Sequence, residues 1–171
     1  MGQRLHAKAE TLVRRANRRR LRLMLRKHPD LGQSPESMLI MTAIWHQRGM
    51  LRWLLEQGVS PNMGCGNTPL MSTAAEGDVW AMRQLLEFGA DPNLLNDRSE
   101  NALGFAVTWQ QPEAIKLLIH AGVDINNQDD SGPDMTQLDS AELSGWHDMA
   151  AVLRSLGGLR FVELSNRALP H

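Results

Sequence analysis

Two consecutive stretches of the chain, residues 67–97 and 100–130, carry the same pattern of residues. Thr68-Pro69-Leu70 matches Asn101-Ala102-Leu103, and Gly89-Ala90-Asp91-Pro92-Asn93 matches Gly122-Val123-Asp124-Ile125-Asn126. Gly89 and Gly122 are 33 residues apart, a period that is typical of stacked helical hairpins. Because each hairpin buries its apolar face only against its neighbours, we expect an elongated stack with a long exposed surface. Such a surface favours binding over catalysis.

Small polar residues and glycines predict where the helices of each unit begin and end. The glycines expected to end the second helices are Gly58, Gly89, Gly122 and Gly157. The residues 21 positions earlier, which suit helix N-caps, are Ser37, Thr68, Asn101 and Thr136. First helices are therefore predicted near 37–45, 68–76, 101–109 and 136–144. The turn that follows each first helix holds, in order, His46, Gly77, Gln110 and Gly145.

The segments Asn67-Thr68-Pro69-Leu70, Ala74-Ala75-Glu76-Gly77 and Gly89-Ala90-Asp91-Pro92-Asn93 give the chain its family resemblance. The pattern resembles the ankyrin repeat over residues 34–158, as four units at 34–65, 66–98, 99–134 and 135–158. The resemblance implies an all-α ankyrin-repeat α-solenoid. Residues 1–33 are expected to form a basic N-terminal helix and half-repeat cap, with a single helix at 16–28. Residues 159–171 form a C-terminal tail.

The composition and the motifs limit the function classes that remain. With 42% apolar and 22% charged residues the chain is globular, and its apolar runs are far shorter than the roughly 20 residues of a membrane span. Cys65 is the only cysteine, which fits a reducing cytoplasm. Zinc-binding and phosphate-binding motifs are absent from the sequence. We therefore expect a cytoplasmic monomer with no catalytic residue, no metal and no cofactor.

The family resemblance also implies where a partner protein would bind. Ankyrin arrays usually hold their partner in a concave groove, against the ends of the first helices and the turns that precede them. The helix-end residues predicted to contact a partner are Ile44, Trp45, Glu76, Thr108, Trp109 and Leu143. Trp45 and Trp109 would stand on one face, and exposed tryptophans of this kind contribute about 2 kcal/mol or more to binding. Alternatively, these indoles cover neighbouring side chains in the two units that lack the turn glycine.

The turn before the third unit supplies three further candidate contacts, Asp97, Arg98 and Glu100. Mixed acidic and polar turns suit a basic partner surface and would speed its association. The alternative is that these turns are polar only because water surrounds them.

The N-terminal 28 residues carry ten Lys and Arg residues and one acidic residue, about +9 against about −10 for the remainder. The basic patch comprises Arg14, Arg15, Arg18, Arg19 and Arg22. These cations could bind nucleic acid or anionic lipid, or belong to an organelle presequence. We favour a capping helix whose cations face the acidic array, because Leu21, Met24 and Leu25 require a covering surface.

Together these features predict a non-catalytic protein-binding module. By analogy with small arrays of the family, it would act as an inhibitor or as an immunity-type protein that occludes a toxin or an enzyme. The alternatives are a nucleic-acid-associated adaptor that uses residues 1–28, and a leaderless secreted ankyrin effector.

Overall fold

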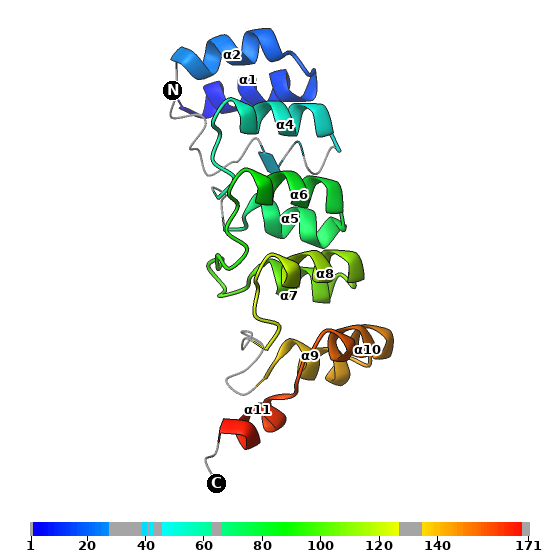
Figure 1. Ribbon diagram of the computed structural model, residues 1–171. Helices are drawn as coiled ribbons and strands as arrows, with labels where there is room; N and C mark the ends of the chain where they lie inside the picture. Colours follow the sequence, from blue (N-terminus) through cyan, green and yellow to red (C-terminus); the bar gives the residue numbers. More distant parts are fainter. Residues whose placement is uncertain are drawn as a thin grey trace.

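The protein is an elongated stack of helices whose first and last helices lie at opposite ends (Figure 1). The computed structural model describes residues 2–27, 39–40, 42, 46–62, 66–126 and 135–168. Its helices are α1 (Gly2–Arg14), α2 (Arg18–Lys27), α4 (Arg48–Glu56), α5 (Pro69–Glu76), α6 (Val79–Glu87), α7 (Ala102–Thr108), α8 (Pro112–His120), α9 (Gln137–Leu143), α10 (His147–Ser155) and α11 (Phe161–Ala168). The all-α solenoid predicted from the sequence is confirmed.

Side-chain caps start the first helix of three repeats at the predicted residues. The Thr68 hydroxyl accepts a hydrogen bond of 3.2 Å from the amide of Met71, and the Asn101 side chain accepts one of 3.0 Å from Gly104. The Thr136 hydroxyl caps α9 in the same way. Each cap satisfies an amide that has no partner inside the helix. The predicted helix at 37–45 lies mostly outside the described residues.

The turn between the two helices of each repeat has one backbone conformation regardless of its residue. Gly77 and Gly145 adopt left-handed φ angles of 67° and 72°. His46 and Gln110 occupy the same position in the other two units, with φ angles of 50° and 53°. The hairpin geometry therefore imposes a left-handed residue here, even where the side chain disfavours it.

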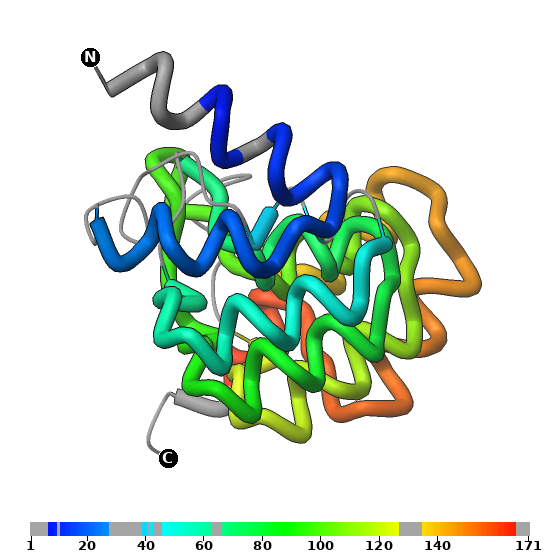
Figure 2. Tube along the Cα trace, turned by 90° about the horizontal axis from the view of Figure 1, so that it is seen from above, coloured from blue at the N-terminus to red at the C-terminus, as the bar shows by residue number. Residues whose placement is uncertain are grey.

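The helices form two layers. In the first layer α5 packs against α7 and α7 against α9, whereas in the second layer α4 packs against α6 and α6 against α8. In Figure 2, seen from above, the second helices α2, α4 and α6 follow one another with a stepwise displacement. The side chains between the layers, such as Leu70, Met82, Leu103 and Ile115, are almost fully buried. The apolar periodicity of the sequence thus marks the shared core.

A helical hairpin stands at the N-terminal end, where the sequence predicted one helix. α1 packs against α2, and Ala9, Leu12 and Val13 of α1 are buried in the common core. The prediction of a single helix was wrong, because the narrow apolar stripe of α1 lies among many polar residues. The hairpin is tied to the next unit by a hydrogen bond of 2.7 Å from Arg18 to the carbonyl of Gly49.

The chain folds back over the last repeat and ends in α11. The amide of Leu159 donates a hydrogen bond of 2.8 Å to Asn126, and the carbonyl of Leu159 accepts one of 2.8 Å from the Thr136 hydroxyl. The tail therefore continues as a helix against α9. No helix within the described ranges is both long enough and apolar enough to cross a membrane.

Candidate partner-binding surface

The C-terminal ends of the first helices place exposed side chains along one edge of the array. Trp109 is the C-cap of α7, and its ring is 62% exposed. Leu143, the last residue of α9, is 77% exposed. Since α7 and α9 pack side by side, these apolar side chains belong to neighbouring units of the same layer. Large apolar groups in water are typical of binding surfaces.

A hollow of about 210 Å³ lies between α7 and α9 beside these residues. It is lined by Val107, Thr108, Met135, Gln137, Ser140, Leu143, Ser144 and Trp146. The hydroxyl of Ser140 is buried beside this hollow and has no hydrogen-bond partner among the described residues.

The structure brings some of the predicted contact residues together and separates others. Thr108 and Leu143 line the same hollow, and Trp109 follows Thr108 directly in the chain. Glu76 is exposed at the equivalent end of α5, one repeat away. Ile44 and Trp45 lie outside the described residues, so the predicted pairing of Trp45 with Trp109 stays a prediction.

The turn that precedes α7 is a closed loop organised by Asn96. The side-chain oxygen of Asn96 accepts hydrogen bonds of 2.9 Å from the amides of Arg98 and Glu100. Its amide nitrogen donates bonds of 2.8 Å to Asn67 and to the Glu100 carboxylate. Asp97 and Arg98 are exposed on this loop. Glu100 is half-buried, and its carboxylate helps to close the loop.

Sequence reasoning missed the residues that form the floor of the hollow. Gln137, Ser140 and Ser144 recur at the spacing that places side chains on one face of a helix. This row of polar residues on the terminal unit was the sequence signal that could have identified them. Met135 precedes the N-cap of α9, and no pattern distinguished it from other loop residues.

The predicted basic patch lies on the N-terminal hairpin. Arg14, Arg15, Arg18, Arg19 and Arg22 are all exposed. Arg18, Arg19 and Arg22 form no ion pair with any described acidic residue, and the expectation that these cations face the acidic array stays a prediction. Arg52, Trp53 and Glu56 of α4 line a hollow together with Arg18 of this hairpin.

The two-layer stack of repeated hairpins defines the class of protein, a helical-repeat solenoid. Residues 39–129 match the family model for ankyrin repeats (3 copies), so the chain belongs to the ankyrin-repeat family. Proteins of this family interact with other proteins. Within the described residues, no three His, Cys, Asp or Glu side chains are grouped so that they could hold a metal ion.

Two relatives share part of the chain. Ankyrin repeat protein nuc-2 of Neurospora crassa is 43% identical over 56 residues, which is 33% of this chain and 5% of that protein. Cyclin-dependent kinase 4 inhibitor B of Bos taurus is 36% identical over 95 residues, 56% of this chain and 71% of the bovine protein. The chain thus spans a small fraction of the fungal protein and most of the bovine one.

Proposed function

We propose that this protein holds a partner protein against the ends of its first helices and inhibits that partner by occlusion. The observation that carries the proposal is the pair of exposed apolar side chains, Trp109 and Leu143, beside the hollow between α7 and α9. Burying both would remove a large apolar area from water, which favours association. A rigid indole and a neighbouring cavity are typical of interface hot spots.

The inhibitory role is supported by similarity. The bovine relative is by name an inhibitor of a cyclin-dependent kinase, and this chain covers 71% of its length. We infer an inhibitory role here too, in which a rigid array covers part of an enzyme or a toxin, as an immunity-type protein does. The residues around the hollow offer apolar area and hydrogen-bonding groups to a partner. We propose a non-catalytic action, as is general for ankyrin-repeat binding modules.

The test is partner capture by matched variants. The protein carrying Trp109→Ala and Leu143→Ala should lose a partner that the wild-type protein captures from its native cells. The control carries Leu95→Ala and Val162→Ala, which remove two comparably exposed apolar side chains elsewhere, and should capture normally. Both variants should keep their thermal midpoints, since none of the four side chains is buried. Capture that survives in the first variant would place the binding site elsewhere.

A separate measurement tests whether the protein inhibits its partner. The captured partner is purified, and its activity is followed while the wild-type protein is added. Activity should fall to near zero at one equivalent, and the Trp109→Ala/Leu143→Ala variant should leave it unchanged. A partner that binds with undiminished activity would make the protein an adaptor.

A further inference from the structure

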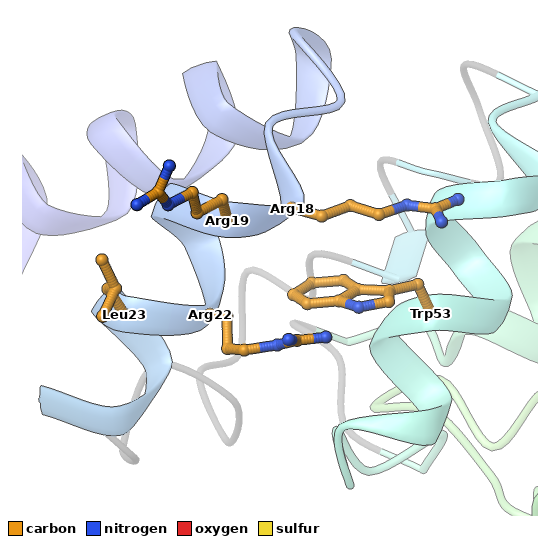
Figure 3. Close-up of a pocket in the computed structure, with 5 residues that line it drawn as sticks. All are labelled: Arg18, Arg19, Arg22, Leu23 and Trp53. Carbon is orange, nitrogen blue, oxygen red and sulfur yellow. The ribbon is translucent and has the colours of Figure 1, made fainter.

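A groove rich in arginine lies between α2 and α4, in the layer of second helices. Its main hollow, of about 490 Å³, is lined by Arg18, Arg19, Arg22, Leu23 and Trp53 (Figure 3). A hollow of about 220 Å³ adjoins it, since both share Arg18 and Trp53, and extends to Arg48, Arg52, Glu56 and Trp80. We call these two hollows the arginine groove. It is built on α2, α4 and α6, whereas the hollow beside Trp109 lies between α7 and α9.

Positive charge is left uncompensated at the α2 end of the arginine groove. Arg48 lies 3.6 Å from the Asp78 carboxylate, and Arg52 pairs with Glu56 at 3.1 Å. Arg19 and Arg22, on α2, have no such partner among the described acidic residues. An anion that enters from this end would therefore meet two exposed guanidinium groups that can bind carboxylate oxygens in pairs.

Trp53 gives the groove a buried donor without an acceptor. The indole lies between the side chains of Arg18 and Arg22 (Figure 3), and the guanidinium carbon of Arg22 is 5.7 Å from the ring centroid. Trp53 is 6% exposed, and its Nε1–H has no hydrogen-bond partner among the described residues. Arginine side chains carry only donors, so neither neighbour can accept this bond. The Glu56 carboxylate lines the adjoining hollow but is paired with Arg52, so the indole donor is left without an acceptor.

The geometry distinguishes between the possible anionic ligands. Single-stranded nucleic acid is held by stacking of bases on open aromatic faces, whereas Trp53 is only 6% exposed and the Arg22 guanidinium lies over its ring. A lipid surface requires an exposed apolar helix face, but Leu21 and Met24 of α2 are buried in the core. Leu23 is 54% exposed at the groove and offers contact to one apolar side chain. Carboxylates with an interspersed apolar residue fit this combination.

We propose that the arginine groove binds an acidic segment of a protein, with carboxylates paired to Arg19 and Arg22. One carboxylate oxygen accepts the indole Nε1–H of Trp53 once the Arg22 side chain turns outward, and an apolar side chain of the segment contacts Leu23. This site is independent of the surface at Trp109 and Leu143, and the two can be occupied separately.

The test uses a fluorescein-labelled peptide of glutamate pairs separated by leucines, with binding followed by fluorescence anisotropy. Arg19→Ala with Arg22→Ala should weaken peptide binding about tenfold or more, since two charge-assisted contacts are lost. The matched control, Arg20→Ala with Arg26→Ala, removes the same charge from exposed positions of α2 outside the groove. It should weaken binding by less than about threefold. Equal losses in the two variants would mean that only net charge matters, and would overturn the proposal.

A second variant tests the indole donor. Trp53→Phe keeps an aromatic ring and removes the N–H, so the peptide should bind about fivefold more weakly. Circular dichroism during thermal unfolding should show a folded protein, since the donor it loses has no partner in the free state. Wild-type affinity in a folded Trp53→Phe variant would contradict the proposal.

Competition experiments test whether a ligand other than an acidic protein segment binds the arginine groove. Duplex DNA, single-stranded DNA and phosphatidylserine vesicles, each at matched anionic charge, should displace the labelled peptide less effectively than unlabelled peptide does. If any of them displaced the labelled peptide at a lower concentration than unlabelled peptide does, that ligand would be the occupant of the groove and the proposal would be overturned. A salt-sensitive dimer in sedimentation that the Arg19→Ala/Arg22→Ala variant loses would identify a second copy as the occupant, against the proposal. The Trp109→Ala/Leu143→Ala variant should bind the peptide normally, so this result does not depend on the proposed inhibitory function.

Discussion

The carboxylate of Asp139, in the first turn of α9, accepts a hydrogen bond of 2.8 Å from the backbone amide of Phe161, the first residue of α11. The same carboxylate accepts bonds of 3.0 Å from the amide of Thr136 and 3.1 Å from the guanidinium of Arg160. Burial raises the pKa of the Asp139 carboxyl, but these hydrogen bonds outweigh it and leave the pKa below its ordinary value. One carboxylate thus closes the start of α9 and fixes the start of α11.

Replacement of Asp139 should make the protein less stable and less sensitive to acid. An Asp in an unfolded chain has a pKa of about 3.9. Because the folded pKa is lower, the carboxylate stabilises the fold fully above about pH 5, and this contribution disappears as the pH falls through the folded pKa. At pH 7, Asp139→Asn should lower the free energy of unfolding by about 1 to 2 kcal/mol. The difference between the variant and the wild type should shrink as the pH falls below about 5 and disappear only below the folded pKa of Asp139.

Urea unfolding followed by circular dichroism between pH 7 and pH 3 measures both effects. The control is Asp97→Asn, since Asp97 is exposed on the loop before α7. Its stability should follow the wild-type curve within about 0.5 kcal/mol. If Asp139→Asn also followed the wild-type curve at every pH, the hydrogen bonds of this carboxylate would contribute nothing to folding.

The turn residue Gln110 should be replaceable by glycine with a gain in stability. Gln110 has a φ of 53°, and a left-handed residue other than glycine costs about 1 kcal/mol. Gln110→Gly should therefore raise the urea midpoint with an unchanged slope. The reciprocal control is Gly145→Gln, at the equivalent position of the last unit, where φ is 72° and the space for a Cβ is open. The Gly145→Gln variant should lose a similar amount of stability. A gain in stability at this position would show that backbone strain does not control these turns.

Two tryptophans should differ sharply in their effect on stability. Trp53→Ala should cost about 3 to 5 kcal/mol, because its ring is 6% exposed and packs within the core. Trp109→Ala should change the free energy of unfolding by less than about 0.5 kcal/mol, because its ring is 62% exposed. Chemical denaturation of both variants provides the comparison. A large loss of stability for Trp109→Ala would mean that its indole covers the neighbouring unit and is not held ready for a partner.

Asn62 should couple two repeats. Its amide nitrogen donates a bond of 3.0 Å to the carbonyl of Gly89, and its oxygen accepts one of 2.8 Å from the amide of Asp91. Loss of both bonds in Asn62→Ala should lower the free energy of unfolding by about 1 to 2 kcal/mol. Hydrogen exchange should locate the weakening at residues 89–91. Asn93→Ala, in the turn that contains Asp91, is the control, since Asn93 donates its hydrogen bond to the Asp91 carboxylate through its backbone amide, which the substitution keeps.

Much of the fold was predictable because its signals are local. Thr68, Asn101 and Thr136 each start a helix with a cap that depends only on residues three positions away. The exposed position of Trp109 followed from counting repeat positions alone. The hairpin of α1 with α2 was missed because Ala9, Leu12 and Val13 give a weak apolar stripe whose burial depends on the neighbouring helix.

The candidate sites were predictable only in part, because they need contacts between distant residues. From its position in the sequence, Glu100 was expected among the exposed turn residues. In the structure, its carboxylate accepts a hydrogen bond from the Asn96 side chain and helps to close the loop. From the sequence, Arg22 was expected to be a surface cation and Trp53 a core residue, with no relation between them. Only their approach to 5.7 Å reveals the arginine groove and an indole donor that has no acceptor among the described residues.

The sequence by itself determined the repeat, its helix ends and the apolar face of each unit, because caps, left-handed turns and periodicity act over a few residues. Tertiary structure alone decided which charges remain unpaired and which polar atoms are buried without a partner. The physical reason is that desolvation and charge pairing depend on the packing of units that lie about 30 residues apart in the chain. The arginine groove and the hollow beside Trp109 are both products of that packing.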